Sequence, residues 1–152
     1  MFIIFCSCNA KNKVSNRLIE DCNKRWEENL KISISEVTFF RWNKMFVFGE
    51  YTSPKEISQA IGFNYVGCEV PDHNKRIVFT FNEKIPYEED FNYVNKHHSV
   101  ISFLPFLNDS IERYFISYKI EDAKFKVKRV KQSNCEDCYF YSLNPINNYI
   151  TK

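Results

Sequence analysis

The sequence has few glycines, almost no net charge and no hydrophobic run long enough to span a membrane. Three glycines among 152 residues leave no glycine-rich loop of the kind that binds nucleotide phosphates. The 21 basic and 19 acidic residues give a formal net charge of +2, which does not indicate a dedicated nucleic-acid-binding protein. No segment approaches the roughly 20 apolar residues of a membrane-spanning helix. The G-x-S-x-G, kinase and H-E-x-x-H signatures of common enzyme classes are also missing.

The chain is instead rich in aromatic residues, with 15 Phe, 9 Tyr and 2 Trp. Hydrophobic residues make up 44% of the sequence, which is enough to build a core and excludes an intrinsically disordered chain. The length fits one domain, because two domains of half this size would each have a very small core. We place this single domain at residues 16–145 and expect residues 146–152 to form a frayed tail.

The first residues resemble the last part of a bacterial lipoprotein signal peptide. The apolar run 1–5 ends at Cys6-Ser7-Cys8, after which the composition changes to Asn, Lys and Ser. Such a signal normally begins with basic residues, and none precedes Cys8, so we expect the natural start to lie further upstream. We interpret residues 1–8 as the remnant of the signal, Cys8 as the lipidation site and residues 9–15 as a polar tether.

A lipid on Cys8 would place the protein at the bacterial cell envelope, with the membrane as its partner through the lipid anchor. The alternative interpretation is a buried N-terminal strand over Phe2–Phe5 in a cytosolic protein.

Two helices are predicted near the front of the domain. In residues 16–31, Leu18, Cys22, Trp26 and Leu30 recur every four residues, so the spacing predicts an amphipathic helix with one apolar face. The second helix begins at Ser53-Pro54-Lys55-Glu56, a capping box with proline at the first helical position. It is expected to end at Gly62, which can adopt the left-handed conformation after a helix.

The remainder of the domain reads mostly as β-structure. Alternation of apolar and polar residues predicts strands within the segments 36–51, 65–70, 75–81, 99–106, 112–120, 123–130 and 139–143. The segment 87–98 is polar and charged, and it is expected to form a helix or a long loop. The predicted fold class is α+β, an antiparallel β-sheet with the N-terminal amphipathic helix and the second short helix packed on it.

The block from Trp42 to Ile57, together with Ile61-Gly62-Phe63, resembles a family of small uncharacterised bacterial lipoproteins. The shared features are a Trp-x-Lys strand, a Tyr-Thr-Ser-Pro turn at residues 51–54 and a short helix closed by glycine. The resemblance covers residues 36–82. It implies an envelope location and brings no known catalytic residues.

The six cysteines divide by position. If Cys6 and Cys8 belong to the signal, four remain in the domain, and an even number in an exported domain favours disulfides. The candidates are Cys22, Cys68, Cys135 and Cys138, with either a local Cys135–Cys138 bridge or long-range bridges.

Two other roles for these cysteines remain open. In a cytosolic protein the same four residues could form a zinc site, although only one Cys-x-x-Cys pair is present. A thiol oxidoreductase using Cys135 and Cys138 would need this pair at a helix N-terminus, whereas the sequence predicts a hairpin turn with Glu136 and Asp137 between them.

A basic strand at residues 124–131 is the candidate binding surface. Lys124, Lys126 and Lys128 share one face at strand period, and Arg129 follows directly. This surface fits anionic lipid, an acidic protein or a nucleic-acid backbone. The alternative is a solvated edge strand whose lysines block pairing with another sheet.

These observations favour a non-enzymatic, lipid-anchored envelope protein of the binding, inhibitor or immunity type, with a protein or envelope ligand as partner. We predict no catalytic residues, cofactor, metal, small-molecule substrate or nucleic-acid partner for it. The first alternative is a cytosolic nucleic-acid- or zinc-binding module that uses the basic strand 124–131, and the second is the thiol oxidoreductase.

Overall fold

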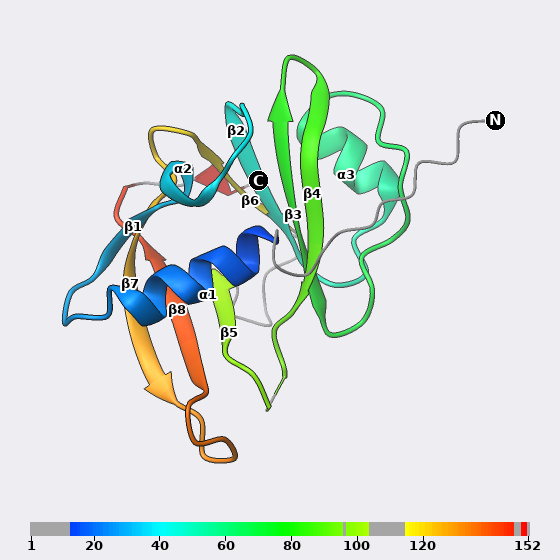
Figure 1. Ribbon diagram of the computed structural model, residues 1–152. Coiled ribbons are helices and arrows are strands. Elements are labelled where there is room, and N and C mark those ends of the chain that lie inside the picture. Colours follow the sequence, from blue (N-terminus) through cyan, green and yellow to red (C-terminus); the bar gives the residue numbers. More distant parts are fainter. Residues whose placement is uncertain (1–12, 96, 104–114, 148–149, 152) are drawn as a thin grey trace.

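The computed structural model describes residues 13–95, 97–103, 115–147 and 150–151 (Figure 1). Its helices are α1 (Val14–Lys24), α2 (Ile34–Val37) and α3 (Pro54–Ile61). Its strands are β1 (Lys31–Ser33), β2 (Lys44–Phe48), β3 (Asn74–Phe81), β4 (Lys84–Asn92), β5 (Val100–Phe103), β6 (Phe115–Lys119), β7 (Lys124–Lys131), β8 (Tyr139–Pro145) and β9 (Ile150–Thr151). The fold class is α+β, as the sequence predicts.

The strands form two sheets rather than the single sheet expected from the sequence (Figure 1). Sheet A has the strand order β1-β7-β8-β5, and sheet B has the order β4-β3-β2-β6-β9. Strands β5 and β8 pair in parallel, and the other described pairs are antiparallel. Helix α1 packs against buried residues of both sheets, and α3 packs against sheet B alone.

Helix α1 and the inner faces of the two sheets form the main core. Val14, Leu18 and Cys22 of α1 are fully buried, at the four-residue spacing that puts them on one helix face. They belong to a cluster with buried residues of both sheets, among them Met45, Ile77, Phe79, Phe103, Phe125, Tyr141 and Leu143. Burial of these side chains holds sheet A and sheet B together through α1.

Helix α3 covers a second, smaller core on the other face of sheet B (Figure 1). Ile57 of α3 packs there with residues of β2 and β3, including Phe48 and Val78. The predicted capping box is present: the Glu56 backbone N–H donates to Ser53 Oγ at 3.3 Å, and the Ser53 backbone N–H donates to Glu56 Oε2 at 2.7 Å. Gly62 ends the helix with φ of 86°, which confirms its predicted role.

Helix α1 is shifted and shorter than the predicted span 16–31. It begins at Val14, so the last residues of the expected tether 9–15 are helical, and Val14 is fully buried. It ends at Lys24, because the following residues join sheet A: the Val127 N–H donates to the Leu30 carbonyl at 2.9 Å. Tertiary pairing thus ends a helix that the apolar spacing alone would continue.

Two other predicted segments differ. Residues 65–70 are not a strand; they form an irregular segment in which Gly67 lies so close to the Tyr65 ring that a Cβ would not fit. The first half of the segment 87–98, expected as helix or loop, continues strand β4 to Asn92. The tail expected to be frayed contains β9, which pairs with β6 of sheet B.

Candidate functional site

The exposed lysines of sheet A form a basic surface. Lys124, Lys126 and Lys128 are exposed and alternate with the buried Phe125 and Val127, so the predicted shared face of the three lysines is confirmed. The antiparallel register places Lys31 of β1 opposite Lys126, and directly paired residues lie on the same face of a sheet. We call Lys31, Lys124, Lys126 and Lys128 the lysine face.

The lysine face has no acidic counterpart in its own sheet. The four strands of sheet A contain no Asp or Glu, and in the part of the chain that the structure describes none of these lysines forms an ion pair. On β8 the residues opposite Lys128 and Lys126 are Ser142 and Asn144. The positive charge of this face is therefore not neutralised by a carboxylate of sheet A or by an ion pair among the described residues.

Arg129 does not belong to this surface, contrary to the prediction. It pairs with the buried Tyr141 and points to the opposite side of β7. Its guanidinium lies 4.2 Å from the centre of the Trp26 ring and 4.3 Å from the centre of the Tyr139 ring. Arg129 thus stabilises the inner side of sheet A through cation–π contacts.

Strand β7 is also not a simple edge strand. β8 pairs along its whole length, and β1 pairs with residues 124–126. Lysines that project from the face of a paired strand do not protect a bare strand edge, so edge protection does not account for Lys124 and Lys126.

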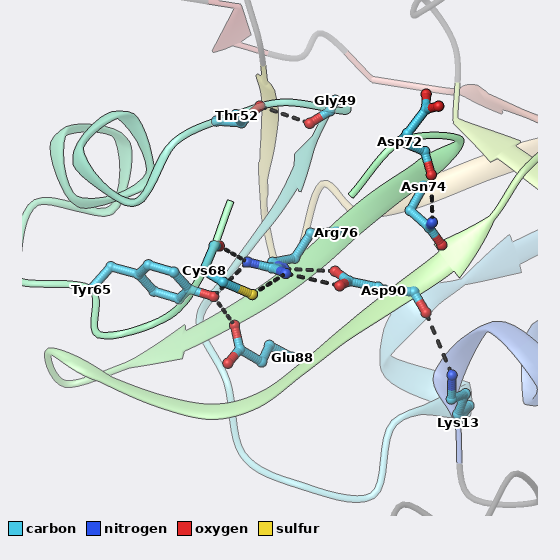
Figure 2. A network of polar contacts seen from close by, with 10 residues as sticks. All are labelled: Lys13, Gly49, Thr52, Tyr65, Cys68, Asp72, Asn74, Arg76, Glu88 and Asp90. Atoms are coloured by element: carbon cyan, nitrogen blue, oxygen red, sulfur yellow. Dashed lines mark hydrogen bonds and ion pairs between the residues drawn. The ribbon is translucent and has the colours of Figure 1, made fainter. Parts of the chain in front are cut away.

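A second polar cluster lies on sheet B, around Arg76 (Figure 2). Arg76 is 4% exposed, and its Nε and Nη2 donate to the two carboxylate oxygens of Asp90 at 2.6 and 2.8 Å. Its Nη1 donates to Tyr65 Oη at 2.8 Å and to the Cys68 carbonyl at 2.5 Å. Tyr65 in turn donates to Glu88 Oε2 at 2.7 Å.

This cluster shifts the protonation of its members and fixes the segment after α3. Burial and the bond to Glu88 raise the pKa of Tyr65. Burial alone would lower the pKa of Arg76, but the bonds to Asp90 outweigh it and the pKa is raised. An arginine has five N–H groups, and those of Arg76 are directed at Asp90, Tyr65 and the carbonyl and sulfur of Cys68. The arrangement ties residues 65–68 to β3 and β4, which is a structural role.

The sequence interpretation missed the functions of three consecutive acidic residues in β4. Glu88 and Asp90 face the Arg76 cluster (Figure 2), whereas Glu89 points the other way and accepts hydrogen bonds from the Val14 and Ser15 N–H groups of α1. Strand alternation separates them. The sequence does contain an indication of this strand, because Ile85 and Tyr87 lie two residues apart, at the period of a strand. The acidic composition of the following residues favoured a loop or helix instead.

The four described cysteines occupy three separate places. Cys135 and Cys138 lie in the turn between β7 and β8 at disulfide distance, with Cα atoms 5.3 Å apart, which fits the local bridge. Cys22 and Cys68 are free; Cys22 lies in the main core, and burial raises the pKa of its thiol to about 12. Cys8 lies outside the described residues.

This distribution does not provide the four-cysteine zinc site. Among the described residues no group of three or more His, Cys, Asp or Glu side chains is placed to hold a metal ion. The Cys135–Cys138 pair is in a hairpin turn, as predicted, and not at a helix N-terminus, where the dipole would lower a thiol pKa.

A cleft of about 360 Å³ lies between α1, β4 and β5. Asparagines line it, including Asn92 and Asn95, whose side-chain oxygens accept the backbone N–H groups of Val94 and His97 at 2.9 Å. These two side chains are therefore used in local turns, which leaves them fewer groups to bind a ligand.

No helix in the described ranges is long and apolar enough to cross a membrane. In the comparisons with known proteins, no family model, curated protein or solved structure matches the chain.

Proposed function

We propose that the chain is a non-enzymatic binding protein of the bacterial cell envelope, anchored by a lipid on Cys8, which engages an anionic partner through the lysine face. The observation that carries the proposal is the exposed set of Lys31, Lys124, Lys126 and Lys128 on a sheet without a single acidic residue. Like charges gathered in this way repel each other and are relieved by a partner of opposite charge.

The buried charged groups Arg76 and Glu89 are used within the fold, which supports a binding role. The carboxylates of Glu89 and Asp90 and the guanidinium of Arg76 all bond to other parts of the chain. Groups engaged in this way hold the domain rigid and are not available to a substrate. The exposed lysines are the charged groups of sheet A that remain directed to solvent.

The anchor at Cys8 rests on the sequence pattern of residues 1–13 and on the resemblance of residues 36–82 to bacterial lipoproteins. Lipid attachment and the lysine face would act together, because a single lipid signal commonly needs a second, basic membrane contact for stable anchoring. Inhibitor and immunity roles fit the same architecture if the anionic partner is a protein.

The test is membrane fractionation of the native host combined with intact-protein mass spectrometry. We expect the protein in the membrane fraction with a lipid on Cys8, and Cys8→Ser should move it to the soluble fraction. A wild-type protein that is soluble and carries an unmodified Cys8 would refute the anchor.

A further inference from the structure

We infer that the partner of the lysine face is the anionic phospholipid surface of a membrane, so that sheet A lies against the bilayer. This inference rests on the proposed binding role but not on the lipid at Cys8. The shared chemistry is a phosphate-rich surface, and the lysine face meets it with charges spread over two strands, β1 and β7.

The spacing of the lysines fits an extended surface better than a single bound ion. Alternate residues of a strand lie about 6.6–6.8 Å apart, so Lys124, Lys126 and Lys128 form a row about two such steps long. Lys31 adds a charge on the neighbouring strand. Lysines attracted to an anionic membrane act additively, and each contributes roughly a fivefold gain in partitioning.

Exposed apolar side chains lie at both ends of this row, on the same face. Val130 follows Lys128 by two residues and is 63% exposed, and Ile146 is 45% exposed. The Ile146 N–H donates to the Lys124 carbonyl at 3.0 Å, which places Ile146 beside Lys124 across β7 and β8. Basic residues flanked by exposed apolar residues are typical of surfaces that enter the headgroup region of a bilayer.

The composition of the face favours lipid over the other anionic partners. Protein interfaces are enriched in arginine and aromatic residues and depleted in lysine, and here Arg129, Trp26 and Tyr139 are stacked together on the opposite side of sheet A. Single-stranded nucleic acids are bound through aromatic side chains that stack with bases. On the lysine face, Lys126 and Lys128 are paired with Asn144 and Ser142. The aromatic Phe140 on this side of β8 is half-buried and pairs with Val130, beyond the last lysine.

The experiment is co-sedimentation of the full chain carrying Cys8→Ser with vesicles of phosphatidylcholine, with and without phosphatidylglycerol. Removing the lipidation site makes the result independent of the anchor. We expect binding to the phosphatidylglycerol vesicles that weakens strongly as salt is raised. The double variant Lys126→Gln/Lys128→Gln should bind about 25-fold less tightly, and Val130→Ser about threefold less.

Matched controls test whether the position of the charge matters. Lys55→Gln/Lys84→Gln removes two exposed lysines from α3 and β4, and Val66→Ser changes a residue that is 90% exposed outside sheet A; both should leave binding within about twofold. Equal losses in the two lysine pairs, or no preference for phosphatidylglycerol, would overturn the inference.

Two further experiments test whether the lysine face binds a membrane, a small anion or a nucleic acid. Inorganic phosphate that displaces the protein more than sodium chloride does at equal ionic strength would indicate a small-anion site and overturn the membrane assignment. Tighter binding to duplex DNA than to phosphatidylglycerol vesicles at equal salt would do the same. Vesicle binding by the Cys8→Ser chain together with an unmodified Cys8 in the host would support this inference while refuting the lipid anchor.

Discussion

Glu89 caps the helix that begins at Val14, although the two residues are 75 positions apart. The Val14 N–H donates to Glu89 Oε2 at 2.7 Å, and the Ser15 N–H donates to Glu89 Oε1 at 3.0 Å. Lys13, the residue before the helix, provides no side-chain cap. The first N–H groups of a helix have no partner within it, so strand β4 supplies the acceptor and the negative charge that favours this helix end.

Glu89→Gln should therefore destabilise the protein while keeping the shape of the side chain. The amide loses the negative charge and one of the two acceptor oxygens, and Glu89 is only 6% exposed. We expect the free energy of unfolding to fall by about 1–2 kcal/mol, measured by urea denaturation. Glu83→Gln in the exposed turn between β3 and β4 is the control, and equal effects of the two substitutions would contradict the capping role.

The ion pair between Arg76 and Asp90 should contribute more than the ion pairs at the surface. Asp90→Asn leaves the guanidinium of Arg76, with a side chain 5% exposed, without its carboxylate. We expect a loss of about 3 kcal/mol, because a buried charge that loses its partner cannot be hydrated.

The comparison for this prediction is Asp21→Asn. Asp21 pairs with Arg25 at 2.8 Å, four residues later on the surface, and its loss should cost under about 0.5 kcal/mol. If Asp90→Asn is as mild as Asp21→Asn, the buried ion pair between Arg76 and Asp90 contributes no more to stability than a surface pair does.

Local signals were readable in the sequence, and contacts between distant segments were not. The Ser53–Glu56 capping box spans three residues, and its partners are fixed by the helix itself. The start of α1 depends on Glu89, which no spacing within residues 13–24 reveals. The two-sheet arrangement likewise depends on which strands pair, since the same alternation in β7 fits a central or an edge position.

Strand β7 contains both a correct and a wrong prediction about the lysine face. Alternation correctly grouped Lys124, Lys126 and Lys128, because a strand exposes every second residue. The same rule places Arg129 on the side of Phe125 and Val127. Arg129 was grouped with the lysines because of its charge, although its position in the strand puts it on the other side. Lys31 was missed because only the β1–β7 register brings it opposite Lys126.

The cysteines should differ sharply in their reaction with iodoacetamide in the native, non-reduced protein. Cys68 is exposed and should be labelled, whereas Cys22 should not, because it is buried and burial raises its pKa to about 12, so that it has almost no reactive thiolate at neutral pH. Cys135 and Cys138 should be labelled only after reduction.

Peptide mapping by mass spectrometry measures each site separately. Unfolding in urea without a reductant is the control, because it should expose Cys22 and leave the Cys135–Cys138 peptide unlabelled. Labelling of Cys135 and Cys138 in the native, non-reduced protein would show that the bridge is absent.

Lys75 is a charged residue whose burial should reduce stability at neutral pH. It is 7% exposed, with Nζ 3.5 Å from Ser102 Oγ and 4.8 Å from the centre of the Tyr93 ring. Burial lowers its pKa from 10.5 to about 8. Between these two pH values the unfolded chain binds more protons at this residue than the folded chain does, so its contribution to stability rises with pH.

Lys75→Met should accordingly stabilise the protein, by about 1–3 kcal/mol at pH 7, because methionine keeps the apolar stem without the charge. The gain should shrink as the pH rises from about 8 to 10.5, where the lysine becomes neutral in both states. Thermal or urea unfolding of the wild-type protein and of the variant across this pH range measures the gain. The effects of other titrating groups cancel in the difference between the two free energies of unfolding. The control is Lys44→Met, at an exposed position on β2, which should show no such pH dependence. If Lys75→Met lowers the free energy of unfolding, or changes it equally at every pH, the buried ammonium is stabilised by its surroundings.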